Sequence, residues 1–210
     1  MSKKYKILLI ILVILIIVCL GLLIVKKYVY DKDTKKNSVT PAVVDNMEKY
    51  GYALEDRDTK LYKNVYYELK EVLDNDEVDY EKYGEKIATL FLIDLLTISN
   101  KVNKYDVGGL DFLYDDEKEM FKNKAMDTIY KDVEDNTYDS RKQELPTVSN
   151  IIIDNVDKDT YKINEDKKLE SYEYEITIEY KKDLEYDKKV SVTVVKDTDK
   201  MYIVKYATIK

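Results

Sequence analysis

An uninterrupted apolar run near the N-terminus constrains this chain more than any other feature. Residues 7 to 25 read ILLIILVILIIVCLGLLIV and contain no charge, amide or hydroxyl. A helix rises about 1.5 Å per residue, so this run would reach about 28 Å, close to the thickness of a hydrocarbon core. We therefore predict a transmembrane helix from Ile7 to Val25 that anchors a water-soluble domain.

A cleaved signal peptide and a lipoprotein anchor fit this run less well. A cleaved signal peptide needs an apolar segment of about 7 to 15 residues followed by small residues at a cleavage site. This run is longer, and Lys26 and Lys27 follow it directly. A lipoprotein would carry its cysteine at the end of the run, whereas Cys19, the only cysteine, follows Val18 and precedes six more uncharged residues. We expect a retained anchor and no intrachain disulfide.

The orientation of the anchor follows less directly, because lysines flank it on both sides. They are Lys3, Lys4 and Lys6 before it, and Lys26, Lys27, Lys32, Lys35 and Lys36 after it. Because more lysines follow the helix than precede it, the positive-inside rule applied to these counts disfavours an external domain. We still expect the short basic tail to act with the first helix as a signal anchor. The predicted parts are a cytoplasmic tail (1–6), the helix (7–25), a linker (26–41) and an extracytoplasmic domain (42–210) on the cell membrane.

The chain beyond the anchor is acidic. The first thirty residues contain five lysines and no acid, which leaves 30 basic and 42 acidic residues, a net charge of −12 for residues 31–210. An acidic domain repels phosphate backbones, and no basic stripe stands out, so we expect no nucleic-acid binding. The expected partners are the membrane and other membrane or envelope proteins, and a homo-oligomer is left open.

Three segments in the first half of the domain predict helices. The first is capped by Asp58 or Thr59 and ends near Asp74, with apolar residues at helical steps: Leu61, Val65, Leu69 and Val72. The second, Val78 to Ser99, is apolar on nearly every side and should be central. The third opens at Asp115 and Asp116 and runs to about Asp135, with one buried stripe: Phe121, Ala125, Ile129 and Val133.

After Pro146 the apolar period changes from about four residues to two, the alternation of half-buried strands. In the clearest segment, residues 172 to 180, one face carries Tyr172, Tyr174, Ile176, Ile178 and Tyr180, and the other carries Glu173, Glu175, Thr177 and Glu179. Three more segments complete the set: Thr147 to Ile153, Val190 to Val194 and Met201 to Ile209. We predict an α+β domain with three helices packed on one face of a four-stranded antiparallel sheet.

This order of elements, behind a single N-terminal anchor, resembles the nuclear transport factor 2-like or cystatin-like folds. In bacteria it is similar to the single-pass assembly subunit of type IV secretion and conjugation systems, whose soluble domain contacts other subunits. The resemblance covers about Ala42 to Lys210 in element order and rests on no family motif, so it carries over no functional residue. It implies protein binding within a membrane machine.

The residue types argue against catalysis. The chain has no histidine, and its one cysteine lies in the apolar run, which removes the commonest general base, the usual zinc ligands and the common nucleophile systems. Gly108-Gly109 is the only glycine pair, and neither a P-loop nor a dinucleotide fingerprint is present, so we interpret it as a turn. The Asp-rich loops lack the calcium-loop pattern. We predict no enzyme, no catalytic residue, no cofactor and no metal site.

Asp94 is the one candidate site residue, because it interrupts the apolar sequence LFLIDLL. It could be a buried acid with a raised pKa in a pocket. On a helical wheel, however, it falls near Thr97 and Lys101, which favours a polar seam that reaches water.

We weigh three functions and favour the first, because the common catalytic groups are absent. The first is a non-catalytic, membrane-anchored interaction or assembly domain, which the 21 tyrosines would also suit unless they only reflect codon usage. The second is an extracytoplasmic protein that binds a small molecule or peptide between helices and sheet. The third is an enzyme that uses Asp and Tyr as acid and base.

Overall fold

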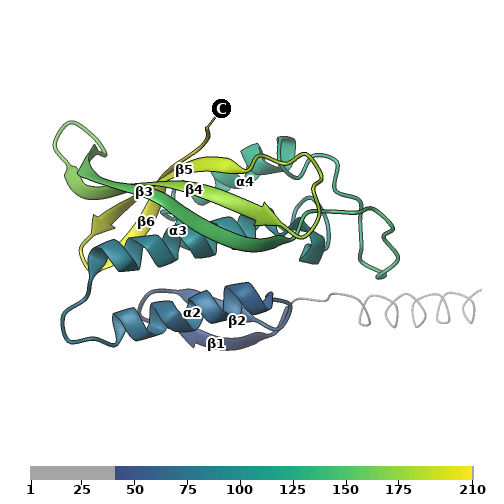
Figure 1. Cartoon of the computed structure of the whole chain (residues 1–210), viewed down its shortest axis with the longest axis horizontal. Helices are drawn as coiled ribbons and strands as arrows, with labels where there is room; N and C mark the ends of the chain where they lie inside the picture. Colours follow the sequence, from purple (N-terminus) through teal and green to yellow (C-terminus); the bar gives the residue numbers. More distant parts are fainter. Residues whose placement is uncertain (1–40, 210) are drawn as a thin grey trace, which may run out of the picture. The chain divides into compact units, whose positions relative to one another are not determined.

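A four-stranded antiparallel sheet occupies the C-terminal part of the domain, as the alternating pattern predicts. The computed structural model describes residues 41–209, and Figure 1 shows their arrangement. Each strand pairs with the next along the chain: β3 (Val148–Lys162), β4 (Lys168–Tyr180), β5 (Lys189–Asp197) and β6 (Lys200–Thr208). The chain is therefore α+β, with a sheet built entirely from sequential neighbours.

The predicted anchor is not tested by this structure. The segment Ile7 to Val25 and all but the last residue of the predicted linker lie outside the described residues. Within residues 41–209, no helix has both the length and the apolar character needed to cross a membrane.

Strand β4 has the two faces that its alternation predicts. The inner face is buried, with Tyr172, Tyr174, Ile176 and Ile178 at most 3% exposed. On the other face Glu175 and Glu179 are exposed. The neighbouring strand β5 continues the inner face with three fully buried side chains: Val190, Val192 and Val194. We call the glutamate-bearing side of the sheet the outer face.

Helix α3 (Tyr80–Leu96) is the central helix that the sequence predicts. Its N-cap is Asp79, whose side chain accepts a hydrogen bond from the backbone N–H of Lys82. The helix packs against all four strands of the sheet and is buried on nearly every side. On the sheet side, the Tyr174 hydroxyl donates to the carbonyl oxygen of Glu81 at 2.7 Å, which ties the inner face to the start of the helix.

Helix α2 (Lys60–Leu73) also matches its prediction, with Thr59 as N-cap and Asp74 as C-cap. Its buried stripe comprises Tyr62, Val65, Tyr66 and Leu69. The helix packs on α3, on the side away from the sheet (Figure 1). Sequence periodicity identifies a buried stripe but not what covers it, so it could not show that this helix forms a further layer.

A two-stranded hairpin precedes α2 and was not predicted. Strand β1 (Val43–Met47) pairs antiparallel with β2 (Tyr52–Glu55), and Gly51 supplies a positive φ of 72° in the turn. Tyr52 and Leu54 are fully buried. The Tyr52 hydroxyl donates to the carbonyl oxygen of Met201 at 3.1 Å, so β2 is joined to the far end of the domain. Strands this short leave too few residues for an alternation to be recognised.

The prediction for the third helix was wrong in its bounds. Helix α4 runs from Lys118 to Asp127, not from Asp115 to about Asp135. The chain turns at Thr128, and Tyr130 becomes fully buried. The Tyr130 hydroxyl donates to the carbonyl oxygen of Leu95 at 2.7 Å and accepts the N–H of Gly108 at 3.2 Å. A helix that continued through Tyr130 would not bury its side chain with both hydrogen bonds formed, which accounts for the earlier end of α4.

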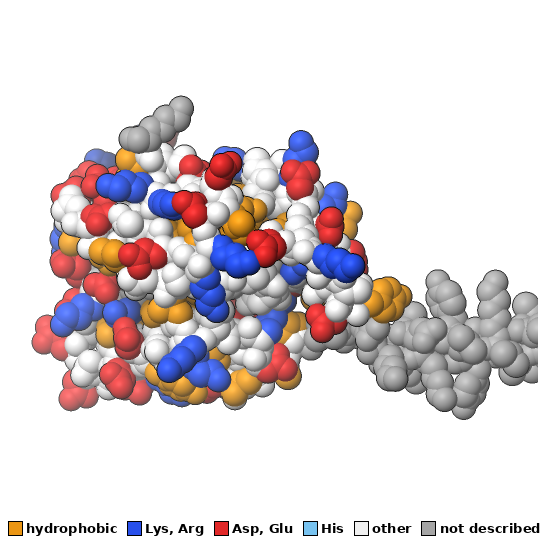
Figure 2. Space-filling view, turned by 45° about the vertical axis from the view of Figure 1, so that its right-hand side comes forward, with side chains coloured by type: hydrophobic (Ala, Val, Ile, Leu, Met, Phe, Trp, Pro, Cys, Tyr) orange, Lys and Arg blue, Asp and Glu red, His pale blue; other side chains and the backbone are white. Residues whose placement is uncertain are grey.

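Short 3-10 helices complete the connection between α3 and α4. Helix η1 (Ile98–Asn100) follows α3 directly, and η2 (Leu110–Phe112) follows the glycine pair. Figure 2 shows one face of the molecule, on which acidic side chains gather at the left and basic ones are interspersed among acids elsewhere. No continuous basic area is visible on that face, in line with the acidic balance of the sequence.

Candidate functional site

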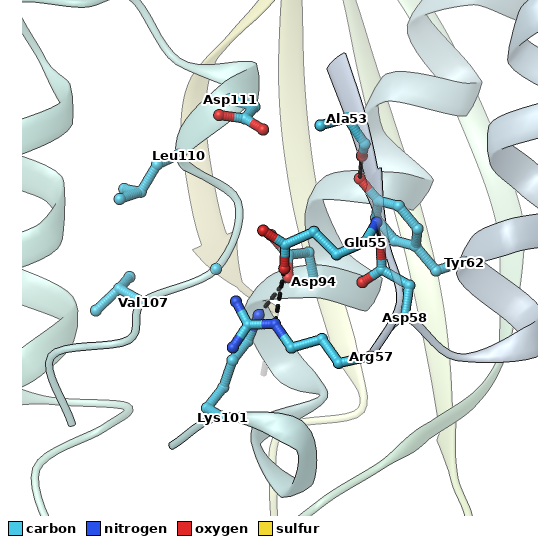
Figure 3. Close-up of a pocket in the computed structure, with 11 residues that line it drawn as sticks. Ala53, Glu55, Arg57, Asp58, Tyr62, Asp94, Lys101, Val107, Leu110 and Asp111 are labelled. Atoms are coloured by element: carbon cyan, nitrogen blue, oxygen red, sulfur yellow. Dashed lines mark hydrogen bonds and ion pairs between the residues drawn. The ribbon is translucent and has the colours of Figure 1, made fainter. Parts of the chain in front are cut away.

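A polar pocket lies where the end of β2, the start of α2, the C-terminal part of α3 and the loop before η2 meet (Figure 3). Its volume is about 160 Å³. The lining residues are Ala53, Glu55, Arg57, Asp58, Tyr62, Asp94, Lys101, Val107, Gly108, Leu110 and Asp111. Four of them carry carboxylates and two carry cations, so the lining has a formal charge of −4 + 2 = −2 with all groups ionised.

Asp94 and Lys101 form the floor of the pocket. Lys101 is only 2% exposed, and its ammonium is paired with the Asp94 carboxylate. The other carboxylate oxygen of Asp94 accepts the backbone N–H of Gly109 at 2.6 Å. Asp94 therefore lines a pocket and also belongs to a polar seam with Lys101. Thr97, the third member of the predicted seam, instead accepts the N–H of Val148 at 3.4 Å.

The glycine pair brings the 107–111 loop against α3. A Cβ atom on Gly108 would lie 2.2 Å from the carbonyl oxygen of Asp94, a distance too short for any side chain. Gly109 has φ of 81°, and a Cβ atom there would meet the Phe91 ring at 2.8 Å. Only glycine fits either position, and the close approach places the Gly109 N–H on Asp94.

Arg57 is held by acids on two sides. Its Nε donates to Glu55 at 2.7 Å, and its two terminal nitrogens donate to both oxygens of Asp106, one of them at 3.1 Å. Asp106 also accepts the N–H of Val102 at 2.8 Å. Burial raises the pKa of Asp106, but the bonds from Arg57 and Val102 outweigh it and keep that pKa below its usual value. Three donors of the guanidinium are thus occupied by acids.

Asp58 and Asp111 have no ion pair that would offset the effect of burial on their pKa. Neither carboxylate has an ion-pair partner among residues 41–209, and Asp58 accepts only the backbone N–H of Glu55, at 2.7 Å. Burial raises the pKa of Asp58 to about 6, with a further contribution from the charge of Asp94 that the Glu55 N–H only partly offsets. Desolvation of the carboxylate and the Asp94 charge also raise the pKa of Asp111, although the residue as a whole is exposed. In both cases the nearby lysines, Lys101 for Asp58 and Lys118 and Lys200 for Asp111, lower the pKa by less than the other effects raise it.

The tyrosine in the pocket lining, Tyr62, uses its hydroxyl in a structural bond. Tyr62 donates to the carbonyl oxygen of Ala53 at 3.3 Å, and burial raises its pKa well above the usual value. The described part of the chain contains no group of three or more His, Cys, Asp or Glu side chains arranged to hold a metal ion. The ionisable groups of the lining are four carboxylates, two paired cations and one phenol.

Asp94 and its proximity to Lys101 were predicted from the sequence. The other charged residues of the pocket were not predicted: Glu55, Arg57, Asp58 and Asp111. The run of charged residues from Glu55 to Asp58 was a signal, because it directly follows the hairpin strand. Comparison of the chain with protein-family models, with curated proteins and with solved structures finds no match. Function is therefore inferred from the residues themselves.

Proposed function

We propose that this chain is a non-catalytic interaction domain held at the membrane by its N-terminal apolar segment, with the domain outside the cytoplasm. The observation that carries the proposal is the acidic outer face of the sheet. Its partner is a membrane or envelope protein with a basic surface. The resemblance in element order to assembly subunits of secretion systems is in keeping with this role.

The outer face displays a set of carboxylates on neighbouring strands. Register places Asp157 opposite Glu173 and Asn155 opposite Glu175 on β3 and β4. The acids of this face are Asp154, Asp157, Asp159, Glu173, Glu175 and Glu179. Directly opposed like charges destabilise a strand pair, so Asp157 and Glu173 lower the stability of the pairing between β3 and β4.

Two lysines share this face by register, Lys189 opposite Thr177 and Lys205 opposite Thr193. Within residues 41–209, only Glu173 of this set forms an ion pair, with Lys205 at 3.1 Å. A protein that presents lysines or arginines to the face would neutralise the remaining carboxylates. Nucleic acids and anionic lipid headgroups carry the same sign of charge as the face and would be repelled.

Site-specific photocrosslinking in membranes of the native host tests this role. A photoreactive amino acid at Glu175, on the outer face, should give a discrete adduct, whereas one at the exposed Lys60 on α2 should not. Lys substitutions at Asp157 and Glu173 should abolish the Glu175 adduct. If the adduct persists with these charge reversals, or if both positions crosslink equally, the outer face is not the interaction surface.

The membrane attachment has its own test. The full chain should remain in the pellet after carbonate washing, whereas a chain lacking residues 1–40 should be released. Protease added to intact spheroplasts should digest the domain. Protection until lysis would place the domain in the cytoplasm and exclude an extracytoplasmic partner.

A second candidate function, binding of a small molecule or peptide, is favoured by the pocket around Asp94. Its position differs from the one expected, since it lies between the hairpin, α2, α3 and the 107–111 loop rather than between helices and sheet. Its polar lining calls for a ligand that carries charge or several hydrogen-bonding groups.

A further inference from the structure

We propose that the pocket bounded by Asp58, Asp94 and Asp111 binds an organic cation, an alkylammonium or alkylguanidinium group. The inference does not depend on the outer face of the sheet, which lies on a different part of the domain. It deepens the second candidate function by naming the chemical class of the ligand.

Charge selects a cation over an anion. Lys101 is paired with Asp94, and Arg57 is paired with Glu55 and Asp106. An anion would have to displace these carboxylates and would meet Asp58 and Asp111 as well. A cation meets two carboxylates, Asp58 and Asp111, that form no ion pair among the described residues, although Lys101 lies near the first and Lys118 and Lys200 act on the second. The lining thus carries two carboxylates outside any ion pair, whereas both of its cations, Arg57 and Lys101, are paired.

Geometry selects an organic cation over a metal ion. The carboxylates of the pocket are spread along different walls, with Asp111 in η2 and Asp58 just before α2 (Figure 3). They form no three-ligand group close enough for a metal among residues 41–209. An ammonium or guanidinium group directs several N–H bonds outward and can reach acceptors that are farther apart.

The rest of the lining suits an alkyl chain. Val107 and Leu110 lie on one side of the pocket, and the Tyr62 ring and Ala53 lie on the other (Figure 3). Lysine and arginine side chains have this amphipathic form, with an apolar stem and a charged end. The same group occurs on free amines, so a protein side chain and a small molecule are both sources of the ligand.

Isothermal titration calorimetry on the full chain in non-ionic detergent tests the proposal with n-butylammonium and n-butylguanidinium as probes. Saturable binding is expected at neutral pH and low salt. The neutral analogue n-butanol should bind about tenfold or more weakly, because it cannot form charge-assisted hydrogen bonds. Asp58→Asn and Asp111→Asn should each weaken cation binding by about tenfold. Glu175→Gln, which removes an acid from the outer face, should leave it unchanged.

Binding should also displace a proton from Asp58. At a pH near its raised pKa, a bound cation favours the ionised carboxylate, so the measured heat should depend on the ionisation enthalpy of the buffer. Asp58→Asn should remove that dependence. This second readout separates a direct role of Asp58 from a general loss of structure, which circular dichroism of each variant checks.

The two sources are separated with N-acetyl-lysine-methylamide, which presents the ammonium on a peptide-like backbone. Tighter binding of this compound than of n-butylammonium assigns the site to a protein side chain, and the reverse assigns it to a free amine. Equal affinity for n-butanol and the cations, or no loss of cation binding in either Asp variant, would overturn the proposal. Failure of this test leaves the crosslinking test of the outer face unaffected, so the two can be judged separately.

Discussion

The Lys101 ammonium and the Asp94 carboxylate form an ion pair in which the lysine side chain is 2% exposed and the aspartate 23%. The two residues are seven positions apart, and the chain turns through η1 between them. The pair therefore fixes the direction in which the chain leaves α3. It also places a charge of each sign at the floor of the pocket.

Removal of one member should be costly, since it leaves a buried charge without its partner. Lys101→Met and Asp94→Asn should each destabilise the domain by about 3 to 5 kcal/mol. The exposed pair Lys182 and Glu144, with side chains 64% and 62% exposed, is the matched control. Lys182→Met should cost no more than about 1 kcal/mol. Urea denaturation measures both, and similar losses for the two lysines would contradict the structural role of the buried pair.

The two faces of β4 should respond differently to truncation. Ile176→Ala or Ile178→Ala removes buried carbon from the inner face and should cost about 2 to 5 kcal/mol. Glu175→Ala on the outer face should change stability by no more than about 0.5 kcal/mol in the absence of a partner. Chemical denaturation decides the matter. Equal losses on both faces would show that the outer face is also covered.

Gly109 and Gly51 make a second matched comparison. Both have positive φ, 81° and 72°, so alanine is strained at either position. At Gly51 the new Cβ meets only the Lys200 ammonium at 3.9 Å, and Gly51→Ala should cost about 1 kcal/mol. Gly109→Ala should cost about 2 to 4 kcal/mol, because its Cβ also clashes with the Phe91 ring at 2.8 Å. Thermal unfolding of both variants checks the difference.

Asp58 should make stability depend on pH. Its pKa of about 6 in the folded protein exceeds the ordinary value of 3.8, so folding takes up a proton between these pH values. The contribution of Asp58 to stability therefore falls as pH rises from about 4 to about 6 and stays low above that range. Asp58→Asn should be about 1 kcal/mol more stable than the native chain at pH 7, after allowance for partial exposure of the site.

The gain from Asp58→Asn should disappear near pH 4, where the native carboxylate is protonated in the folded protein. Urea midpoints across this range provide the measurement. Glu55, Asp94 and Lys101 lie close to Asp58 and contribute to its environment, so the profile should be compared between the two chains at each pH. A gain that is constant with pH would show that Asp58 is not the titrating group.

The features predicted correctly from the sequence were those set by local periodicity. Helices α2 and α3 and strands β4, β5 and β6 each carry a repeating apolar pattern that burial enforces. Strand β3 was predicted only from Thr147 to Ile153, but it runs from Val148 to Lys162, and most of its side chains beyond Ile153 are exposed, so no apolar pattern marks that part. Helix α4 was overestimated because the stripe Phe121, Ala125, Ile129 and Val133 continues past the residue where the helix ends. The end of α4 is set by burial of Tyr130, whose hydroxyl bonds to Leu95, a residue distant in sequence. Apolar periodicity carries no information about such a contact.

The pocket was only partly predictable for a related reason. Asp94 and Lys101 lie on one stretch of chain, so a helical wheel brings them together. Asp58 and Asp111 join them only when the hairpin and the 107–111 loop fold back over α3. Contacts between residues so far apart in sequence depend on tertiary packing. The charged run from Glu55 to Asp58 is visible in the sequence, but nothing local shows that it meets Asp94.

The hairpin at the start of the domain has a mechanical consequence. Among residues 41–209, strand β1 pairs with β2 alone, and its first residue, Val43, lies opposite Glu55 at the open end of the ladder. Tension that reaches the domain from its N-terminal side would load these hydrogen bonds one after another, as in unzipping, rather than all together in shear. Strand β1 should therefore peel away at low force while the four-stranded sheet stays intact, and the hairpin would behave as a release point under load.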